Sequence, residues 1–152
     1  MKPEAVIPVV LLLLLCSCSS QNLSSGRAEE IFLIYNIKVG ESGGFTNNNQ
    51  GYIIDSTGLV SSFQAIAIKA PVLKALGNLT PDDIKELNLS INEIKDQKYS
   101  EKGNITSYIS LTKGSEELRV SWPGHEPNGS VPEQIRKFYS KLRHKINSIQ
   151  NK

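Results

Sequence analysis

The chain has 152 residues, of which 39% are hydrophobic and 21% are charged. This composition excludes a mostly disordered protein, and the length suits one ordinary domain rather than two. The net charge of +2 is too small to indicate a nucleic-acid partner.

The first residues form a targeting segment that is separate from the fold. Lys2 precedes the apolar stretch Ala5–Leu15, and small polar residues follow it. The stretch is shorter than the roughly 20 residues that a membrane-spanning helix needs. This arrangement predicts a secretory signal, so we expect the mature protein to lie outside the cytoplasm.

Both cysteines fall at the end of this segment, in Leu15-Cys16-Ser17-Cys18. The stretch resembles a bacterial lipoprotein signal, in which a leucine three positions before the lipidated cysteine and a small residue directly before it are typical. The resemblance implies a signal peptide over residues 1–17 and acylation of Cys18, for example with palmitate. Several acyl chains would give a stable membrane anchor. A plain secreted protein that loses both cysteines is the alternative.

A polar segment over residues 18–30 predicts a flexible tether between the lipid and a single domain over residues 31–152. Ser19 is not the aspartate typical of inner-membrane retention, so we expect the outer membrane if the cell has two. Several Asn-x-Ser/Thr sequons would also fit a glycosylated eukaryotic chain. We prefer the bacterial interpretation because the chain is rich in Asn and Ser; the sequons are at Asn22, Asn78, Asn88, Asn104 and Asn128.

The first half of the domain predicts three strands and a helix. Ile31–Val39, Gly51–Asp55 and Leu59–Ile68 are rich in β-branched and aromatic residues and predict a three-stranded meander. Residues 70–79 contain Pro71 and Gly77 and are expected to be irregular. Thr80 is then a natural N-cap before Pro81. The helix should reach about Asp96, with an apolar stripe of Ile84, Leu87, Ile91 and Ile94.

The second half predicts two strands and a helix. Asn104–Thr112 and Glu117–Trp122 alternate in polarity around a hairpin turn, with Trp122 on the core side. Ser130-Val131-Pro132-Glu133 has the pattern of a capping box and predicts the start of the last helix. The expected fold is an α+β sandwich, in which a five-stranded, antiparallel-rich sheet carries two helices on one face. The apolar stripe of the last helix is Ile135, Phe138, Leu142, Ile146 and Ile149.

This order of elements also predicts which loops lie together. Suppose that the first strand runs up and that three strands precede the first helix. Residues 41–50, 69–79 and 113–115 then lie at the top end of the sheet. Residues 122–130 would then lie at the bottom, so that Phe45 and His125 could not share one site.

Candidate catalytic groups are sparse. The mature chain has only His125 and His144 and no cysteine besides Cys18, and it shows neither a metal-ligand motif nor a nucleophile motif. We therefore expect no enzyme and no cofactor. A zinc site that uses His125, Glu126 and a distant third ligand is the alternative, whereas Asp82-Asp83 fits the start of a helix.

The last helix carries a second candidate surface. Its basic residues could contact anionic headgroups or an acidic partner, or they could form an ordinary solvated face. These residues are Arg136, Lys137, Lys141, Arg143 and Lys145.

Three features together resemble the emfourin family. They are Gly43-Gly44-Phe45 after the first strand, the extended Tyr108-Ile109-Ser110-Leu111, and Trp122-Pro123 before a helix that begins near Pro132. The resemblance implies a small α+β domain that inhibits thermolysin-like metallopeptidases, and it makes Gly43, Gly44 and Phe45 the candidate partner-binding loop. The alternative function is that of a structural or assembly lipoprotein that docks an envelope partner.

Overall fold

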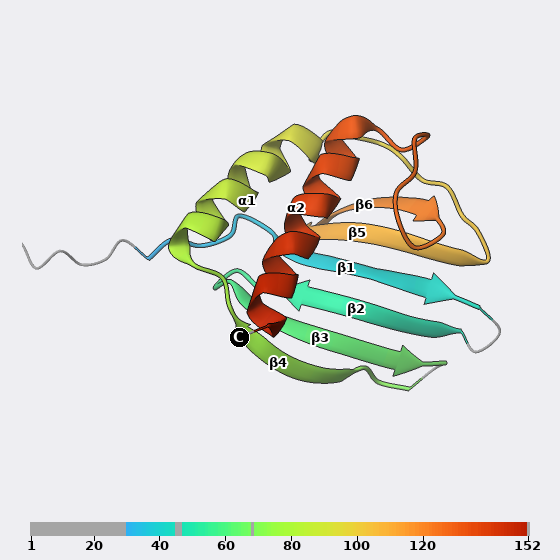
Figure 1. Cartoon of the computed structure of the whole chain (residues 1–152), viewed down its shortest axis with the longest axis horizontal. Helices are drawn as coiled ribbons and strands as arrows, with labels where there is room; N and C mark the ends of the chain where they lie inside the picture. The colour runs from blue at the N-terminus through green and yellow to red at the C-terminus, as the bar shows by residue number, and fades with distance from the viewer. Residues whose placement is uncertain (1–29, 45–46, 68, 152) are drawn as a thin grey trace, which may run out of the picture.

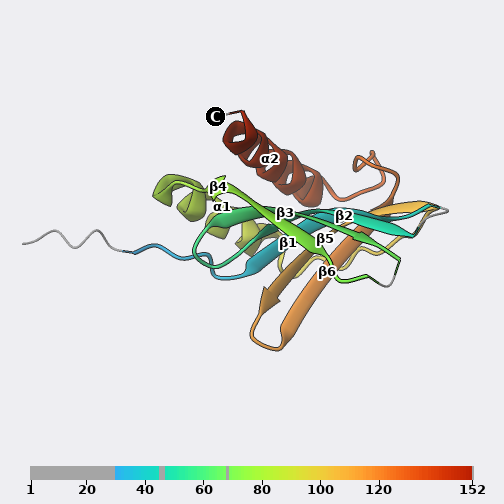
Figure 2. The same cartoon turned by 90° about the horizontal axis from the view of Figure 1, so that it is seen from below.

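The computed structural model describes residues 30–44, 47–67 and 69–151. Within these residues six strands form one antiparallel sheet, and two helices pack on one face of it, called the inner face below (Figures 1 and 2). The predicted α+β class is confirmed, whereas the predicted number of five strands is wrong. The elements are β1 (Asn36–Gly43), β2 (Asn48–Ile54), β3 (Leu59–Ile66), β4 (Val72–Asn78), α1 (Pro81–Ile94), β5 (Ile105–Lys113), β6 (Glu116–Pro123) and α2 (Glu133–Gln150), and the strand order is β4-β3-β2-β1-β5-β6.

The strand that the sequence prediction missed is β4, which pairs with β3 at the edge of the sheet. Pro71 lies just before β4, where its missing N–H removes no bond from the ladder. At Gly77 an added Cβ would lie 2.9 Å from Ile149 Cγ2. Glycine therefore allows α2 to approach the sheet closely here. Both residues are compatible with an edge strand, although proline and glycine in a sequence usually indicate the absence of a strand.

The additional strand reverses the direction of the elements that follow it. With β1 running up, β4 runs down, so β5 starts at the top, where Ile105 pairs with Gly43. The loop after β6 therefore lies at the same end as the β1–β2 connection, and His125 Nδ1 lies 2.5 Å from Glu41 Oε2. The prediction that residues 122–130 lie opposite residues 41–50 is wrong, because it assumed three strands before the first helix. We call this end of the sheet the loop end.

The chain enters the sheet later than predicted, since β1 begins at Asn36 and not at Ile31. The preceding segment crosses α1, where the side-chain amide of Asn88 accepts the N–H of Ile34 and donates to the C=O of Phe32, both at 2.9 Å. Leu33, between them, is buried. One amide side chain thus satisfies backbone groups that a neighbouring strand would otherwise pair.

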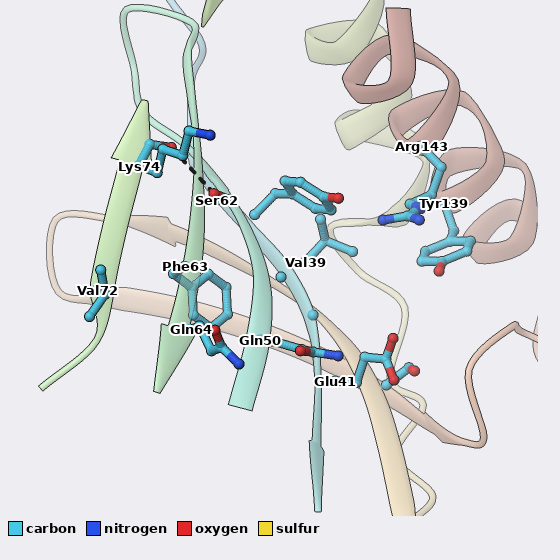
Figure 3. A pocket seen from close by; sticks show the side chains of 14 residues that line it. Val39, Glu41, Gln50, Ser62, Phe63, Gln64, Val72, Lys74, Tyr139 and Arg143 are labelled. Carbon is cyan, nitrogen blue, oxygen red and sulfur yellow. Dashed lines mark hydrogen bonds between the residues drawn. The ribbon is translucent and has the colours of Figure 1, made fainter. Parts of the chain in front are cut away.

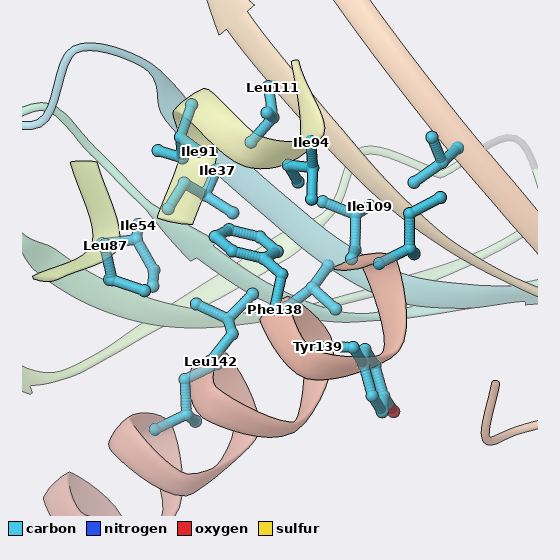
Figure 4. Packing of buried hydrophobic residues seen from close by; sticks show 14 of the residues in the cluster. Ile37, Ile54, Leu87, Ile91, Ile94, Ile109, Leu111, Phe138, Tyr139 and Leu142 are labelled. Carbon is cyan, nitrogen blue, oxygen red and sulfur yellow. The ribbon is translucent and has the colours of Figure 1, made fainter. Parts of the chain in front are cut away.

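The core fills the space between the inner face and the helices, and Figure 4 shows its central residues. Both predicted helix stripes are confirmed, with Ile149 only partly buried. Trp122 is fully buried, as predicted, and its ring meets Tyr139 edge to face at 5.2 Å between centroids. The buried stripe residues are Ile84, Leu87, Ile91, Ile94, Ile135, Phe138, Leu142 and Ile146.

The two helices begin in different ways. Thr80 caps α1 as predicted: its hydroxyl oxygen accepts the N–H of Asp83, whose carboxylate accepts the N–H of Thr80. The predicted capping box of the last helix is wrong, because α2 starts at Glu133 and Pro132 occupies the cap position without a side-chain bond. The Ser130 hydroxyl instead donates to Asn128 Oδ1 at 2.6 Å. Ser130 therefore stabilises the preceding loop.

Aromatic side chains from the strands themselves pack on the outer face of the sheet, which neither helix covers. Phe63 is buried there and lies over Gly40, where an added Cβ would come within 3.1 Å of the ring. Lys38 Nζ lies 4.6 Å from the centroid of the same ring. Tyr108 is also buried on this face, under the guanidinium of Arg119. Glycine at position 40 thus makes room for an aromatic side chain that closes the outer face.

Candidate functional site

A groove lies on the inner face where α2 leaves part of the sheet uncovered (Figure 3). Its volume is about 490 Å³; β1, β2, β3 and β4 form its floor, and Tyr139 and Arg143 of α2 form one wall. We call it the α2 groove. Its other lining residues are Val39, Gly40, Glu41, Gln50, Gly51, Tyr52, Ser62, Phe63, Gln64, Val72, Lys74 and Ser107.

Strand alternation explains which polar and apolar side chains line the groove. Side chains two residues apart on one strand share a face, and the strand pairing places Val39, Tyr52 and Ser62 side by side on the inner face. Continuing towards the loop end, the same face carries Glu41 and Gln50, which pair directly. Helix α2 covers the apolar part of this face, so the polar part remains open to solvent.

The two ends of the groove differ in charge. At the loop end, Glu41 is bonded to His125. Lys74 on β4 and Arg143 on the α2 wall (Figure 3) make no ion pair with any residue that the structure describes. Arg143 instead stacks over the ring of Tyr52, with 5.3 Å to the centroid. The groove therefore offers two cationic groups without an acidic partner among the described residues, Lys74 at the edge of the sheet and Arg143 on α2.

Tyr139 lies between these two ends. Burial raises the pKa of Tyr139 to about 12, with Glu126 and Glu41 acting in the same direction and Arg143 opposing them. The phenol therefore stays protonated at neutral pH. Its hydroxyl donates to the carbonyl oxygen of His125 at 3.4 Å, and it does not act as a base.

The pair of Glu41 and His125 is the arrangement in the groove that most resembles a catalytic group. The side chain of His125 is 64% exposed. The neighbouring hydroxyl of Ser107 donates to the carbonyl oxygens of Gly124 and His125, at 2.7 and 3.1 Å. Ser107 therefore holds the loop after β6 and is not paired with the imidazole. The pair offers a polar contact for a ligand group, whereas the serine is committed to the loop.

The zinc alternative required a third ligand beside His125 and Glu126. Across residues 30–44, 47–67 and 69–151, no group of three or more His, Cys, Asp or Glu side chains could hold a metal ion. The partner that the structure gives His125 is Glu41, from a strand far away in the sequence.

Gly43 and Gly44 are needed for the backbone conformation at the loop end. Their φ angles are +122° and +74°, values that favour glycine. An added Cβ at Gly43 would lie 2.2 Å from the carbonyl oxygen of Asn104, and the N–H of Gly44 donates to that oxygen. These two glycines therefore join the β1–β2 connection to the start of β5. Phe45, the third residue of the candidate loop, lies outside the described residues.

The predicted basic surface on α2 is divided among different contacts. Lys145 is buried and donates to Asp83 Oδ1 at 2.5 Å and to Glu86 Oε2 at 2.6 Å. Lys141 pairs with Glu86 at 3.0 Å. These two lysines face α1, whereas Arg143 faces the groove. The remaining two make local contacts: Lys137 with Glu133 and Arg136 with the carbonyl oxygen of Val131.

The pKa shifts follow from these contacts. Burial on its own would lower the pKa of Lys145, but its hydrogen bonds to Asp83 and Glu86 outweigh burial and raise it. Burial would raise the pKa of Asp83, but the hydrogen bonds from Lys145 and Thr80 lower it. The hydrogen bond from Lys145 is the main cause that lowers the pKa of Glu86. All three groups are therefore charged at neutral pH.

The sequence prediction missed Tyr52 and Tyr139 of the groove, and it named Arg143 only as part of a basic surface on the last helix. Tyr139 follows Phe138 of the apolar stripe, and no local motif distinguishes Tyr52. They come together only because α2 crosses β2, as the bond between Gln150 Nε2 and the Tyr52 hydroxyl shows. A regular helix period could have placed Tyr139 and Arg143 on one face, since they are four residues apart.

The lipidation residue Cys18 and the signal peptide over residues 1–17 lie outside the described residues. Among the residues that are described, no helix is long and apolar enough to cross a membrane. No protein-family model matches the sequence, and a comparison with curated proteins also finds no match.

Proposed function

We propose that this chain is a lipid-anchored lipoprotein of the bacterial cell envelope whose domain binds another protein and has no catalytic activity. The anchor is acylated Cys18, at the end of a signal that comprises residues 1–17. The proposed target is a secreted metallopeptidase of the thermolysin type, which the protein inhibits as emfourins do. The motif Gly43-Gly44-Phe45 is the sequence feature that favours this target.

The observation that supports a binding role most strongly is the α2 groove. It is open, about 490 Å³ in volume and lined by both polar and apolar residues, and the sheet and a helix that is packed on the core hold its walls in place. Binding sites commonly combine a few fixed polar groups with aromatic walls. The groove provides Arg143, Tyr52 and Tyr139 for this purpose, and it leads to the loop end, where the candidate loop begins.

An envelope-docking function through the basic residues of α2 is less well supported. Lys141 and Lys145 bind acidic residues of α1, so they hold the helices together and are not free to form one basic surface. Arg143 is available for a partner, but it belongs to the groove.

The function is tested by titrating the full chain, purified in detergent, against a thermolysin-like peptidase. We expect saturable inhibition at micromolar or lower concentration. Arg143→Glu should weaken it by at least about tenfold, which corresponds to about 1.4 kcal/mol. Lys98→Glu, at an exposed position outside the groove, should inhibit like the wild type. Absence of inhibition by the wild type would rule out this target class.

The anchor is tested separately by metabolic labelling with a palmitate analogue. The wild type should be labelled and should sediment with membranes, whereas Cys18→Ser should be neither labelled nor retained. Equal membrane association of the two proteins would contradict the proposed anchor.

A further inference from the structure

The two edge strands of the sheet, β4 and β6, differ in whether another segment hydrogen-bonds to their outward side. Next to β6, the N–H of Ser121 donates to the carbonyl oxygen of Tyr99, and the N–H of Glu101 donates to the carbonyl oxygen of Ser121. The segment before β5 thus covers part of that edge. At the opposite edge β4 pairs with β3 alone, and no other described segment pairs with it. The outward N–H and C=O groups of β4 therefore remain open to another strand.

Exposed apolar side chains gather at this open edge. Val72 is 73% exposed and Leu73 is 59% exposed, and Ile66, at the end of the neighbouring strand β3, is 51% exposed. Proteins usually protect edge strands with charges, prolines or bulges. Here the irregularity lies between Val60 and Ser61, near the other end of the β3–β4 pair. The first half of β4 is thus accessible and carries the apolar Val72 and Leu73 beside the charged Lys74.

We propose that the open edge of β4 captures an extended, acidic segment of the target protein, which adds to the sheet as a further strand. This inference deepens the proposed binding function and rests on it. A row of outward backbone N–H and C=O groups is matched by another extended backbone. Residues that pair across two strands point to the same face, so each side chain of the segment meets one β4 side chain.

The side chains of β4 define the chemistry of the captured segment. Lys74 points to the inner face and into the α2 groove, where it has no acidic partner among the described residues. An acidic residue opposite Lys74 would supply one. Val72 shares this face, and Leu73 lies on the outer face. Apolar residues opposite these two would cover the exposed side chains.

Charge complementarity favours a segment of another protein over pairing of two copies of this chain through β4. The sequence of β4 is VLKALGN and contains no acidic residue. If two copies paired through β4, neither Lys74 would gain a counter-ion from the partner strand. An acidic segment of the target would pair with the outward N–H and C=O groups of β4 and would also supply a counter-ion for Lys74.

The test is selection from a displayed library of random nine-residue peptides, with the full chain in detergent as bait. Against the wild type we expect β-branched sequences with Asp or Glu at one fixed position. Against Lys74→Glu we expect Lys or Arg at that position, and the acidic peptides selected by the wild type should bind this variant about tenfold more weakly. Lys98→Glu serves as the matched control and should select the same acidic peptides as the wild type. Amide exchange in residues 72–76 should slow when a selected peptide binds.

Three results would overturn the inference. They are selected peptides that do not change with Lys74→Glu, selected peptides that leave amide exchange in β4 unaltered, and a free chain that dimerises with β4 protected. The selection contains no peptidase, so it is independent of the inhibition titration. If peptides bind as expected but no peptidase is inhibited, the proposed target class fails and the β4 site stands. If the peptidase is inhibited equally by the wild type and Lys74→Glu, the β4 site fails and the proposed function stands.

Discussion

Lys145 is the residue whose charge is most closely tied to the packing of the helices. Its side chain is 10% exposed and reaches Asp83 and Glu86 on α1 from α2. Because a lysine ammonium is costly to bury without partners, the two carboxylates are required once α2 covers it. Asp83 also closes the cap of Thr80, so one carboxylate serves both the start of α1 and the contact between the helices.

Replacing Lys145 by methionine should destabilise the domain by about 1–2 kcal/mol. This is less than the cost of breaking a fully buried pair, because Asp83 and Glu86 retain contact with water. Lys141→Met is the matched control on the same helix, and its half-exposed pair with Glu86 should contribute about 0–1 kcal/mol. Urea unfolding at neutral pH measures both. Equal losses in the two variants would contradict a special role for Lys145.

At the scale of elements, different interactions stabilise the first turns of the two helices. The first turn of α1 is stabilised by a reciprocal pair between Thr80 and Asp83. The first turn of α2 has no side-chain cap, but Ile135 and Phe138 are buried directly after it. Packing therefore fixes the position of α2, whereas local hydrogen bonds contribute directly to α1.

Thr80→Ala should therefore lower the free energy of unfolding by about 1 kcal/mol, since it removes a capping side chain. Ser130→Ala, at the position that the sequence also marks as a cap, should cost less, because Ser130 bonds only to exposed loop groups. Thermal or urea unfolding of the two variants provides the comparison. A larger loss for Ser130→Ala would mean that the loop before α2 contributes more than the cap of α1.

At the scale of the whole molecule, the contact between the helices makes stability depend on pH. The pKa values of Asp83 and Glu86 are lowered from their ordinary values of 3.8 and 4.5. Their contribution is therefore present above these values and is lost as the pH falls through the lowered ones. The pKa of Lys145 is raised from 10.5, so its contribution is present below that value and is lost as the pH rises through the raised one.

The stability difference between the wild type and Lys145→Met should therefore be constant from about pH 6 to pH 10 and should shrink at lower pH, where Asp83 and Glu86 become protonated. Urea unfolding of both proteins at about pH 3, pH 7 and pH 10 measures it, and the difference should be smaller only at about pH 3. A difference that stays the same at about pH 3 would show that the lost lysine stem, and not the charge, causes the destabilisation.

Local signals in the sequence were enough to predict the α+β class, both helix stripes, the Thr80 cap and the buried Trp122. They failed at β4, because an edge strand beside Pro71 and Gly77 has few buried residues to mark it. That single omission reversed the predicted direction of β5 and β6 and separated His125 from the loop end. The direction of each strand depends on how many strands precede it in an antiparallel sheet. Missing one strand therefore moves every later loop to the other end of the sheet.

The candidate site was harder to predict from the sequence than the fold. The positive φ angles of Gly43 and Gly44 are a local requirement of the β1–β2 connection, which a glycine pair in the sequence can meet. The groove was not predicted, because Tyr52 and Arg143 meet only after α2 has packed across the sheet. The basic surface was predicted from composition alone, which could not show that Lys141 and Lys145 face α1.

The most direct test of the proposed binding surface is amide hydrogen exchange of the full chain in detergent, with and without a thermolysin-like peptidase. We predict slower exchange in residues 48–54, 62–64 and 72–76, which belong to strands that line the α2 groove. Residues 113–116, at the opposite end of the sheet, should exchange at the same rate in both samples. Unchanged exchange throughout the groove strands, or protection confined to residues 113–116, would contradict the account.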